Sequence, residues 1–159
     1  MKTIRYILLT GIITLLPACG KEEDRYALPG YVNFEVNVNI QDGELKTPTN
    51  YKQFTQPRLS GESVGYSGLL VVCSAVPVTS GIFQLYAYDL CCRHENRREI
   101  KIVPQPDGVT AKCPVCGSVY NIFNGLGNVV SGPSENNLQR YYAIYSGTRP
   151  GVFRITRTN

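Results

Sequence analysis

Histidine and tryptophan are nearly absent from this sequence: among 159 residues, His94 is the one histidine and there is no tryptophan. Catalytic sets that use a histidine base, such as Ser-His-Asp or Cys-His, cannot be assembled unless His94 takes part. The sequence therefore favours a protein that is not a self-contained enzyme.

A large net charge of either sign is also missing. Charged residues make up 18% of the chain, and the formal net charge is +4. Lys2 and Arg5 lie in a segment that we expect to be removed, and without them fourteen basic residues face twelve acidic ones, a net charge of +2. Nucleic-acid binding usually needs a clustered and stronger positive charge. We therefore expect no nucleic-acid partner.

No sustained 3.6-residue apolar period follows residue 18, and no internal repeat is present. Fifteen Gly, ten Pro and eleven Tyr instead favour short strands joined by turns. Residues 31–40 alternate between apolar and polar, whereas residues 44–65 look like a loop with at most one short strand. We expect an all-β fold, a small antiparallel sandwich or barrel in a single domain over residues 31–159. Its further strands are expected at 69–72, 81–88, 99–103, 119–123, 129–130, 141–145 and 152–156.

The longest apolar run, Ile7 to Leu16, has ten residues and is too short for a transmembrane helix of ~20 residues. It follows a basic start and ends in Leu16-Pro17-Ala18-Cys19, which matches a bacterial lipobox. We expect residues 1–18 to be a signal peptide and Cys19 to be lipidated. The alternative is an ordinary secretory signal with an incidental cysteine.

Residues 19–30 form the expected lipidated tether, which contains the charged run Gly20-Lys21-Glu22-Glu23-Asp24. This run resembles the signal that follows the lipidated cysteine in surface-exposed lipoproteins of Bacteroidota-type bacteria. The resemblance implies a lipid-anchored protein of the cell envelope, in the outer membrane, with the leaflet and surface exposure left open.

Five further cysteines carry the candidate chemistry. Cys113 and Cys116 form a Cys-x-x-Cys turn, which suits a tetrahedral metal, an iron–sulfur centre or a redox disulfide. A redox disulfide is disfavoured because residues 117–120 look like a turn and a strand, not the helix that lowers the pKa of a reactive thiol. Cys92 and His94 are separated by one residue, whereas paired zinc ligands usually have two to four residues between them. That spacing is natural if each loop gives one ligand to each of two irons.

These motifs, with their order along the chain, resemble the Rieske family over roughly residues 65 to 147. The family has a Cys-x-His loop, then a Cys-x-x-His loop followed by Gly-Ser-x-Tyr, then a Gly-Pro loop. The resemblance implies a Rieske-like fold, a 2Fe-2S cluster, cluster-binding loops at 89–98 and 112–120, and a covering loop at 131–134. The matching residues are Cys92, His94, Cys113, Gly117, Ser118, Tyr120, Asn124-Gly125 through Val130, Ser131-Gly132-Pro133, Leu138 and Tyr141. By the same resemblance, Gly117, Ser118, Tyr120, Gly132 and Pro133 surround the cofactor.

The chain departs from the family at two points. Cys116 stands where the second histidine would be, and Val115 and Arg97 stand where two loop-bridging cysteines often occur. The implied ligands are Cys92 and Cys113 on one iron, with His94 and Cys116 on the other. Three thiolates give an oxidised cluster a net charge near −1, so its reduction potential should lie between plant-type ferredoxin and Rieske values, roughly −400 to +300 mV. Hydrogen bonds from Ser118 and Tyr120 to cluster sulfur would raise it somewhat.

Several alternatives stay open. His94 lies in a polar loop and can be unligated, with Cys91 replacing it in a zinc-ribbon-like site, or the site can be empty. Cys73, on an apolar strand, is expected to be a buried hydrophobe, and a Cys73–Cys91 disulfide is a further alternative.

The leading hypothesis is an exported lipoprotein domain, monomeric, that transfers single electrons to an unidentified redox partner through a Rieske-like 2Fe-2S cluster. Rieske-type oxygenases need a second iron held by two histidines and a carboxylate, which one histidine cannot supply. The alternative is a structural zinc-binding or metal-free β module that acts in binding.

Overall fold

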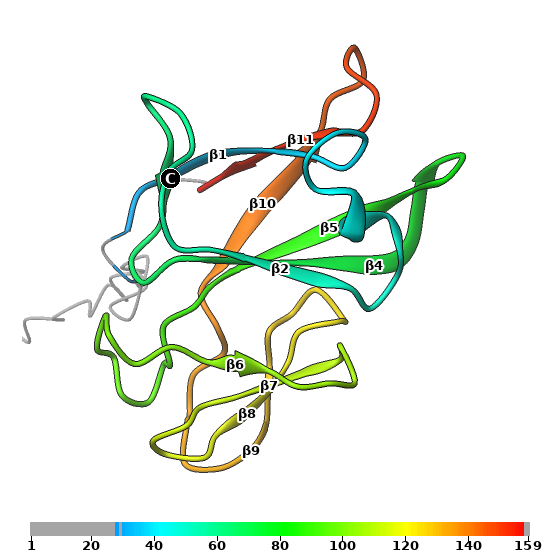
Figure 1. Ribbon diagram of the computed structural model, residues 1–159. Helices are drawn as coiled ribbons and strands as arrows, with labels where there is room; N and C mark the ends of the chain where they lie inside the picture. The colour runs from blue at the N-terminus through cyan, green and yellow to red at the C-terminus, as the bar shows by residue number, and fades with distance from the viewer. Residues whose placement is uncertain (1–27, 29, 158–159) are drawn as a thin grey trace, which may run out of the picture.

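The computed structural model describes residue 28 and residues 30–157. The expected signal peptide, the lipidation site Cys19 and nearly all of the tether therefore lie outside the described residues. Within them the chain forms two antiparallel sheets, a seven-stranded sheet that is nearly closed into a barrel and a separate four-stranded sheet (Figure 1). The prediction of an all-β antiparallel fold is confirmed.

The larger sheet has the strand order β2-β4-β5-β10-β11-β1-β3, and the smaller sheet has the order β6-β7-β8-β9. The strands of the larger sheet are β1 (Val32–Asn37), β2 (Tyr51–Phe54), β3 (Ser63–Val64), β4 (Leu69–Thr79), β5 (Ile82–Asp89), β10 (Arg140–Tyr145) and β11 (Val152–Thr156). Those of the smaller sheet are β6 (Val103–Pro104), β7 (Thr110–Lys112), β8 (Val119–Asn121) and β9 (Val129–Ser131). A short 3-10 helix, η1 (Gly43–Lys46), precedes β2. No helix in the described part of the chain is long and apolar enough to cross a bilayer.

The fully apolar start of β4 is explained by two cores. Leu69 and Val71 lie in the core inside the barrel, whereas Leu70 and Val72 lie in a second core that the smaller sheet shares. Because neighbouring residues of a strand point to opposite faces, a strand between two cores is apolar at every position. The same strand continues to Thr79, and its side chains are exposed from Ala75 onwards.

The ends of the first predicted strand need correction. Val32, Phe34 and Val36 are buried in alternation as predicted, but β1 ends at Asn37 and Ile40 is 80% exposed. The Asp42 carboxylate accepts a hydrogen bond from the Asn37 backbone N–H at 2.9 Å, so the chain turns back before Ile40. Val38, just past the strand, is still buried in the barrel core, so only the last apolar residue of the alternation, Ile40, has no core to face.

Two other predictions of strands were wrong in detail. Residues 44–65 contain two short strands, β2 and β3, where at most one was expected; β2 lies at the sheet edge and is mostly exposed, so it has no apolar period. Residues 99–103 do not form a continuous strand. Ile100 and Ile102 point into the second core, but only a single bridge, Cys91 to Lys101, pairs this segment before β6.

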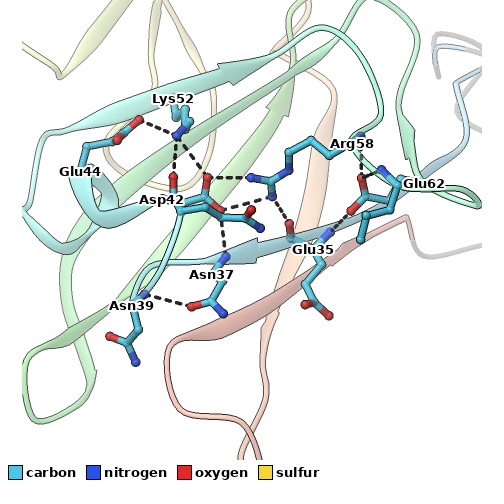
Figure 2. Close-up of polar contacts among 10 residues, drawn as sticks. Glu35, Asn37, Asn39, Asp42, Glu44, Lys52, Arg58 and Glu62 are labelled. Carbon is cyan, nitrogen blue, oxygen red and sulfur yellow. Dashed lines mark hydrogen bonds and ion pairs between the residues drawn. The ribbon is translucent and has the colours of Figure 1, made fainter.

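A buried carboxylate, Asp42, lies at the centre of a polar network beside β1 (Figure 2). Asp42 is fully buried and forms salt bridges with Arg58 at 2.9 Å and with Lys52 at 3.2 Å. The Arg58 guanidinium also lies over the rings of Phe34 and Phe54, 4.6 and 5.1 Å from their centroids. This network attaches the β1–β2 connection and the segment after β2 to the barrel core.

We expect Arg58→Leu to lower the free energy of unfolding by about 3 kcal/mol, because it leaves the buried Asp42 carboxylate with Lys52 as its remaining cation. Urea denaturation followed by far-UV circular dichroism measures the change. Arg154→Leu, at an exposed position of β11, is the matched control and should change stability little. Equal effects of both variants would contradict a stabilising role for the network.

Candidate metal centre

The first cysteine loop begins where β5 leaves the barrel. After Asp89 the chain pairs with its own return segment: Ile102 N–H donates to the Leu90 carbonyl at 2.8 Å, and Cys92 N–H donates to the Ile100 carbonyl at 3.1 Å. A tight turn follows, in which Asn96 N–H donates to the Cys92 carbonyl at 2.9 Å. The loop thus presents Cys92, which is fully buried, to the second core.

Asp89 fixes this loop to the barrel. Its carboxylate is fully buried and accepts hydrogen bonds from the backbone N–H groups of Tyr66 (2.7 Å), Ser67 (3.1 Å) and Cys91 (2.9 Å), and from the Tyr141 hydroxyl (2.7 Å). Burial, with the adjacent Asp89 charge, raises the pKa of Tyr141 and keeps its hydroxyl protonated as a donor. This role of Asp89 was not predicted from the sequence. The one feature of the sequence that indicates it is an acidic residue between an apolar strand and a cysteine pair.

The second loop connects two short paired strands, β7 and β8. Cys113 N–H donates to the Ser118 carbonyl at 2.8 Å, and Gly117 N–H donates to the Cys113 carbonyl at 3.1 Å. Gly117 has a φ of +75°, which a residue with a side chain rarely adopts. The turn-then-strand prediction for residues 117–120 is confirmed, and Cys113 and Cys116 project from one tight knuckle.

The two loops bring three sulfur atoms together. The ligand atoms of Cys92, Cys113 and Cys116 all lie within 4.8 Å of one another. Cys92 Sγ is 3.6 Å from Cys116 Sγ. Cys92 and Cys113 are buried, and Cys116 is half-buried. Three convergent thiols form a donor set suited to zinc or iron, which thiolates bind strongly.

Two hydroxyl groups contact these thiols. The Cys116 thiol donates to Ser118 Oγ at 3.1 Å, and Ser134 N–H donates to the same oxygen at 3.0 Å. The buried Tyr120 hydroxyl lies 3.4 Å from Cys92 Sγ. The predicted pair Ser118 and Tyr120 therefore lies directly against the three-sulfur group.

The Cys113 and Cys116 thiols do not ionise alike. Burial raises the pKa of Cys113 to about 11, since a thiolate is poorly solvated there. Burial also opposes ionisation of Cys116, but hydrogen bonds with Ser118 and the neighbouring thiols lower its pKa overall. A bound metal would therefore have to supply positive charge that favours the Cys113 thiolate, whereas the Cys116 thiol ionises more readily.

The loop predicted to cover the site, residues 131–134, packs on the second cysteine loop. Gly132 has a φ of +95°, and a Cβ added to it would lie 2.5 Å from Ser118 Cα. Only glycine permits this approach, which also places Ser134 N–H on the Ser118 hydroxyl. Pro133, the other predicted residue of this loop, is exposed.

We expect Gly132→Ala to destabilise the protein by about 2 kcal/mol and to weaken metal binding, because the loop must move away from Ser118. Thermal unfolding and titration of bound metal with a chelator measure the two effects. Gly147→Ala is the control, since an added Cβ meets no atom within 4 Å there and Gly147 has no positive φ. An unchanged chelator titration for Gly132→Ala would show that the covering loop does not support the site.

The other candidate ligands lie apart from the three sulfurs. His94 is exposed and does not belong to the group within 4.8 Å, so its role as a ligand stays a prediction. Cys91 contacts the carbonyl groups of Arg97 at 3.4 Å and Cys92 at 3.5 Å, and it also lies outside the group. Cys73 is buried in the barrel core, as predicted, and both Cys73 and Cys91 are free thiols and not a disulfide.

One side of the second loop is open to solvent. A cavity of about 490 Å³ lies against residues 112–117, with Val103 and Gln105 on its other wall. Cys116 lines this cavity, and the Val115 side chain at its edge is 61% exposed. The cavity gives metal, chelator or a partner a path to the half-buried thiol.

No family model matches this chain, and no curated protein matches it. Solved structures do match, among them a chain from a complex of reduced oxygenase and oxidised ferredoxin in carbazole 1,9a-dioxygenase. That match has 17% sequence identity and a TM-score of 0.44, and it covers 79% of this chain and 92% of the other. A likeness this distant carries no argument about metal or function.

Proposed function

We propose that this chain is the metal-binding β domain of an exported lipoprotein, and that it carries a Rieske-like 2Fe-2S cluster for one-electron transfer. The observation that carries the proposal is the convergence of Cys92, Cys113 and Cys116 from two loops far apart in the sequence. The ordered Rieske-like motifs around them, with His94 as the fourth ligand, favour iron and sulfide over other metals.

The residues around the sulfurs suit such a group. Cys92 and Cys113 lie in the second core with Tyr120, which keeps water from that side of the site. Ser118 and Tyr120 contribute hydroxyl groups, which can donate to sulfur and favour the reduced form. When bound, the cluster supplies reversible transfer of one electron. His94 is exposed, as a ligand at the protein–solvent boundary would be.

The proposed protein is an electron carrier and not a self-contained enzyme, because one histidine cannot supply a second, catalytic iron site. It is anchored through Cys19 to the membrane of the cell envelope, in our proposal the outer membrane. It works as a monomeric domain with a redox partner protein and without nucleic acid.

Metal and sulfide analysis of anaerobically purified protein tests the proposal. We expect about two iron and two sulfide per chain, a reddish-brown colour and an electron paramagnetic resonance signal on reduction. Colourless protein with stoichiometric zinc would exclude the cluster.

A structural zinc site is the second candidate, and one distance favours it. Two thiolates bound to one tetrahedral zinc at ~2.3 Å lie roughly 3.8 Å apart, close to the 3.6 Å between Cys92 Sγ and Cys116 Sγ. In that case Cys116→Ser would lower stability and zinc content, and no reduction signal would exist in any variant.

A further inference from the structure

A second cavity lies beside the first cysteine loop and has a different chemical character. Its volume is about 350 Å³, and Leu126 and Leu138 form the apolar part of its lining. The remaining lining residues all carry N–H donors: Arg93, Arg140, Asn136, Asn137 and Gln139. Among the residues that the structure describes, no carboxylate lines the cavity.

Two arginines contribute guanidinium groups to the wall of this cavity. Arg93 is only 8% exposed, and its Nη1 donates to Gln139 Oε1 at 3.4 Å. Arg140 is exposed, and no carboxylate of the described residues forms a salt bridge with it. The Arg93 guanidinium is thus buried in the wall of the cavity, and the Arg140 side chain is exposed to solvent.

The backbone around the cavity is fixed. Asp89 N–H donates to the Gln139 carbonyl at 2.8 Å, and Arg140 pairs with Tyr88 where β10 meets β5. On the other side, Leu138 N–H donates to the Gly127 carbonyl at 2.9 Å. The backbone that carries these donors is therefore ordered before a ligand binds, which reduces the entropic cost of binding.

We propose that this cavity binds a small oxyanion, a carboxylate or a phosphate group, between Arg93 and Arg140. A guanidinium offers paired N–H donors that match the oxygens of both groups, and the neighbouring amides offer more. The cavity is large enough for inorganic phosphate or a short dicarboxylate. The site does not depend on the metal centre, although Arg93 stands between Cys92 and His94 and places the anion beside it.

Isothermal titration of the detergent-solubilised full chain with sodium phosphate, and separately with sodium succinate, tests this proposal. Chloride keeps the ionic strength constant. We expect saturable one-to-one binding of at least one probe, with and without bound metal. The tighter probe identifies the source of the oxyanion as a phosphate or a carboxylate.

Arg140→Gln should weaken that binding about ten-fold or more, since it removes one of two guanidinium groups. Arg140 is exposed, so the variant should keep its fold, which far-UV circular dichroism and thermal unfolding check. Arg154→Gln, also exposed but on β11, is the control and should bind as the wild type does. Absence of saturable binding, or equal binding by the wild type and Arg140→Gln, would overturn the proposal. Equal weakening by both variants would overturn it too, because it would indicate general charge screening.

Discussion

In the iron-loaded protein, we expect Cys116→His to raise the reduction potential by roughly 200 mV. Replacing a thiolate by a neutral imidazole changes the net charge of an oxidised 2Fe-2S core from near −1 to near 0, which favours adding an electron. The size of the expected shift is taken from proteins in which two histidines replace two cysteine ligands. In those proteins the reduction potential rises from about −400 mV to between about −150 and +300 mV.

The structure provides room for this substitution. Cys116 is half-buried and lines the cavity of about 490 Å³, so the larger imidazole can extend into open space. The same change at Cys92 or Cys113 would place a ring inside the fully buried core and would disrupt packing. Position 116 is therefore the site at which charge can be changed with the least structural cost.

Protein-film voltammetry of the wild type and Cys116→His measures the shift. Cys91→Ala is the matched control: Cys91 is a buried neighbour of Cys92 outside the three-sulfur group, so its removal should leave the potential and the iron content unchanged. Loss of iron in Cys91→Ala would favour the alternative ligand set with Cys91. A potential that does not change in Cys116→His would show that Cys116 is not a ligand.

The sequence predicted the thiols of this site better than the strands that carry it. Cysteine spacing is a local property of a tight turn, so Cys113 and Cys116 were identified directly, and the Rieske-like motif order linked them to Cys92. The three sulfurs do converge. Whether His94 joins them depends on how an exposed side chain responds to a bound metal, which spacing alone does not determine.

The strands were predicted well where a core imposes a period and poorly elsewhere. The hairpin of β10 and β11 lies where predicted, and β5 differs by one residue at each end. The edge strand β2 has no apolar period because three of its four residues are not buried. Residues 99–103 show the opposite error, since Ile100 and Ile102 alternate into the second core from a segment that is mostly not paired.

Asp89 could not be assigned from the sequence, because three of its four partners come from two distant segments. Tyr66 and Ser67 precede it by more than twenty residues, and Tyr141 follows it by 52. A carboxylate that accepts four hydrogen bonds in a buried position joins these segments to the first cysteine loop. Its importance is a property of the assembled fold and leads to the second large prediction.

We expect Asp89→Ala to lower the free energy of unfolding by about 4 kcal/mol and to abolish metal binding. Four buried donors, including the backbone N–H of Cys91, would lose their acceptor, and each hydrogen bond to a charged group contributes about 1.5 to 3 kcal/mol. Part of that loss is recovered as the loop relaxes towards water. The relaxation itself moves Cys92 away from Cys113 and Cys116, so stability and metal content should fall together.

Tyr141→Phe separates the two effects, because it removes one of the four donors and leaves the backbone contacts of Asp89 intact. It should lower the free energy of unfolding by about 1.5 to 3 kcal/mol, with metal content close to that of the wild type. Denaturant unfolding of the metal-free chain, together with metal analysis of each purified variant, gives both quantities. If Asp89→Ala retains full metal content, the backbone hydrogen bonds of the loop hold it without the carboxylate, and Asp89 does not position the site.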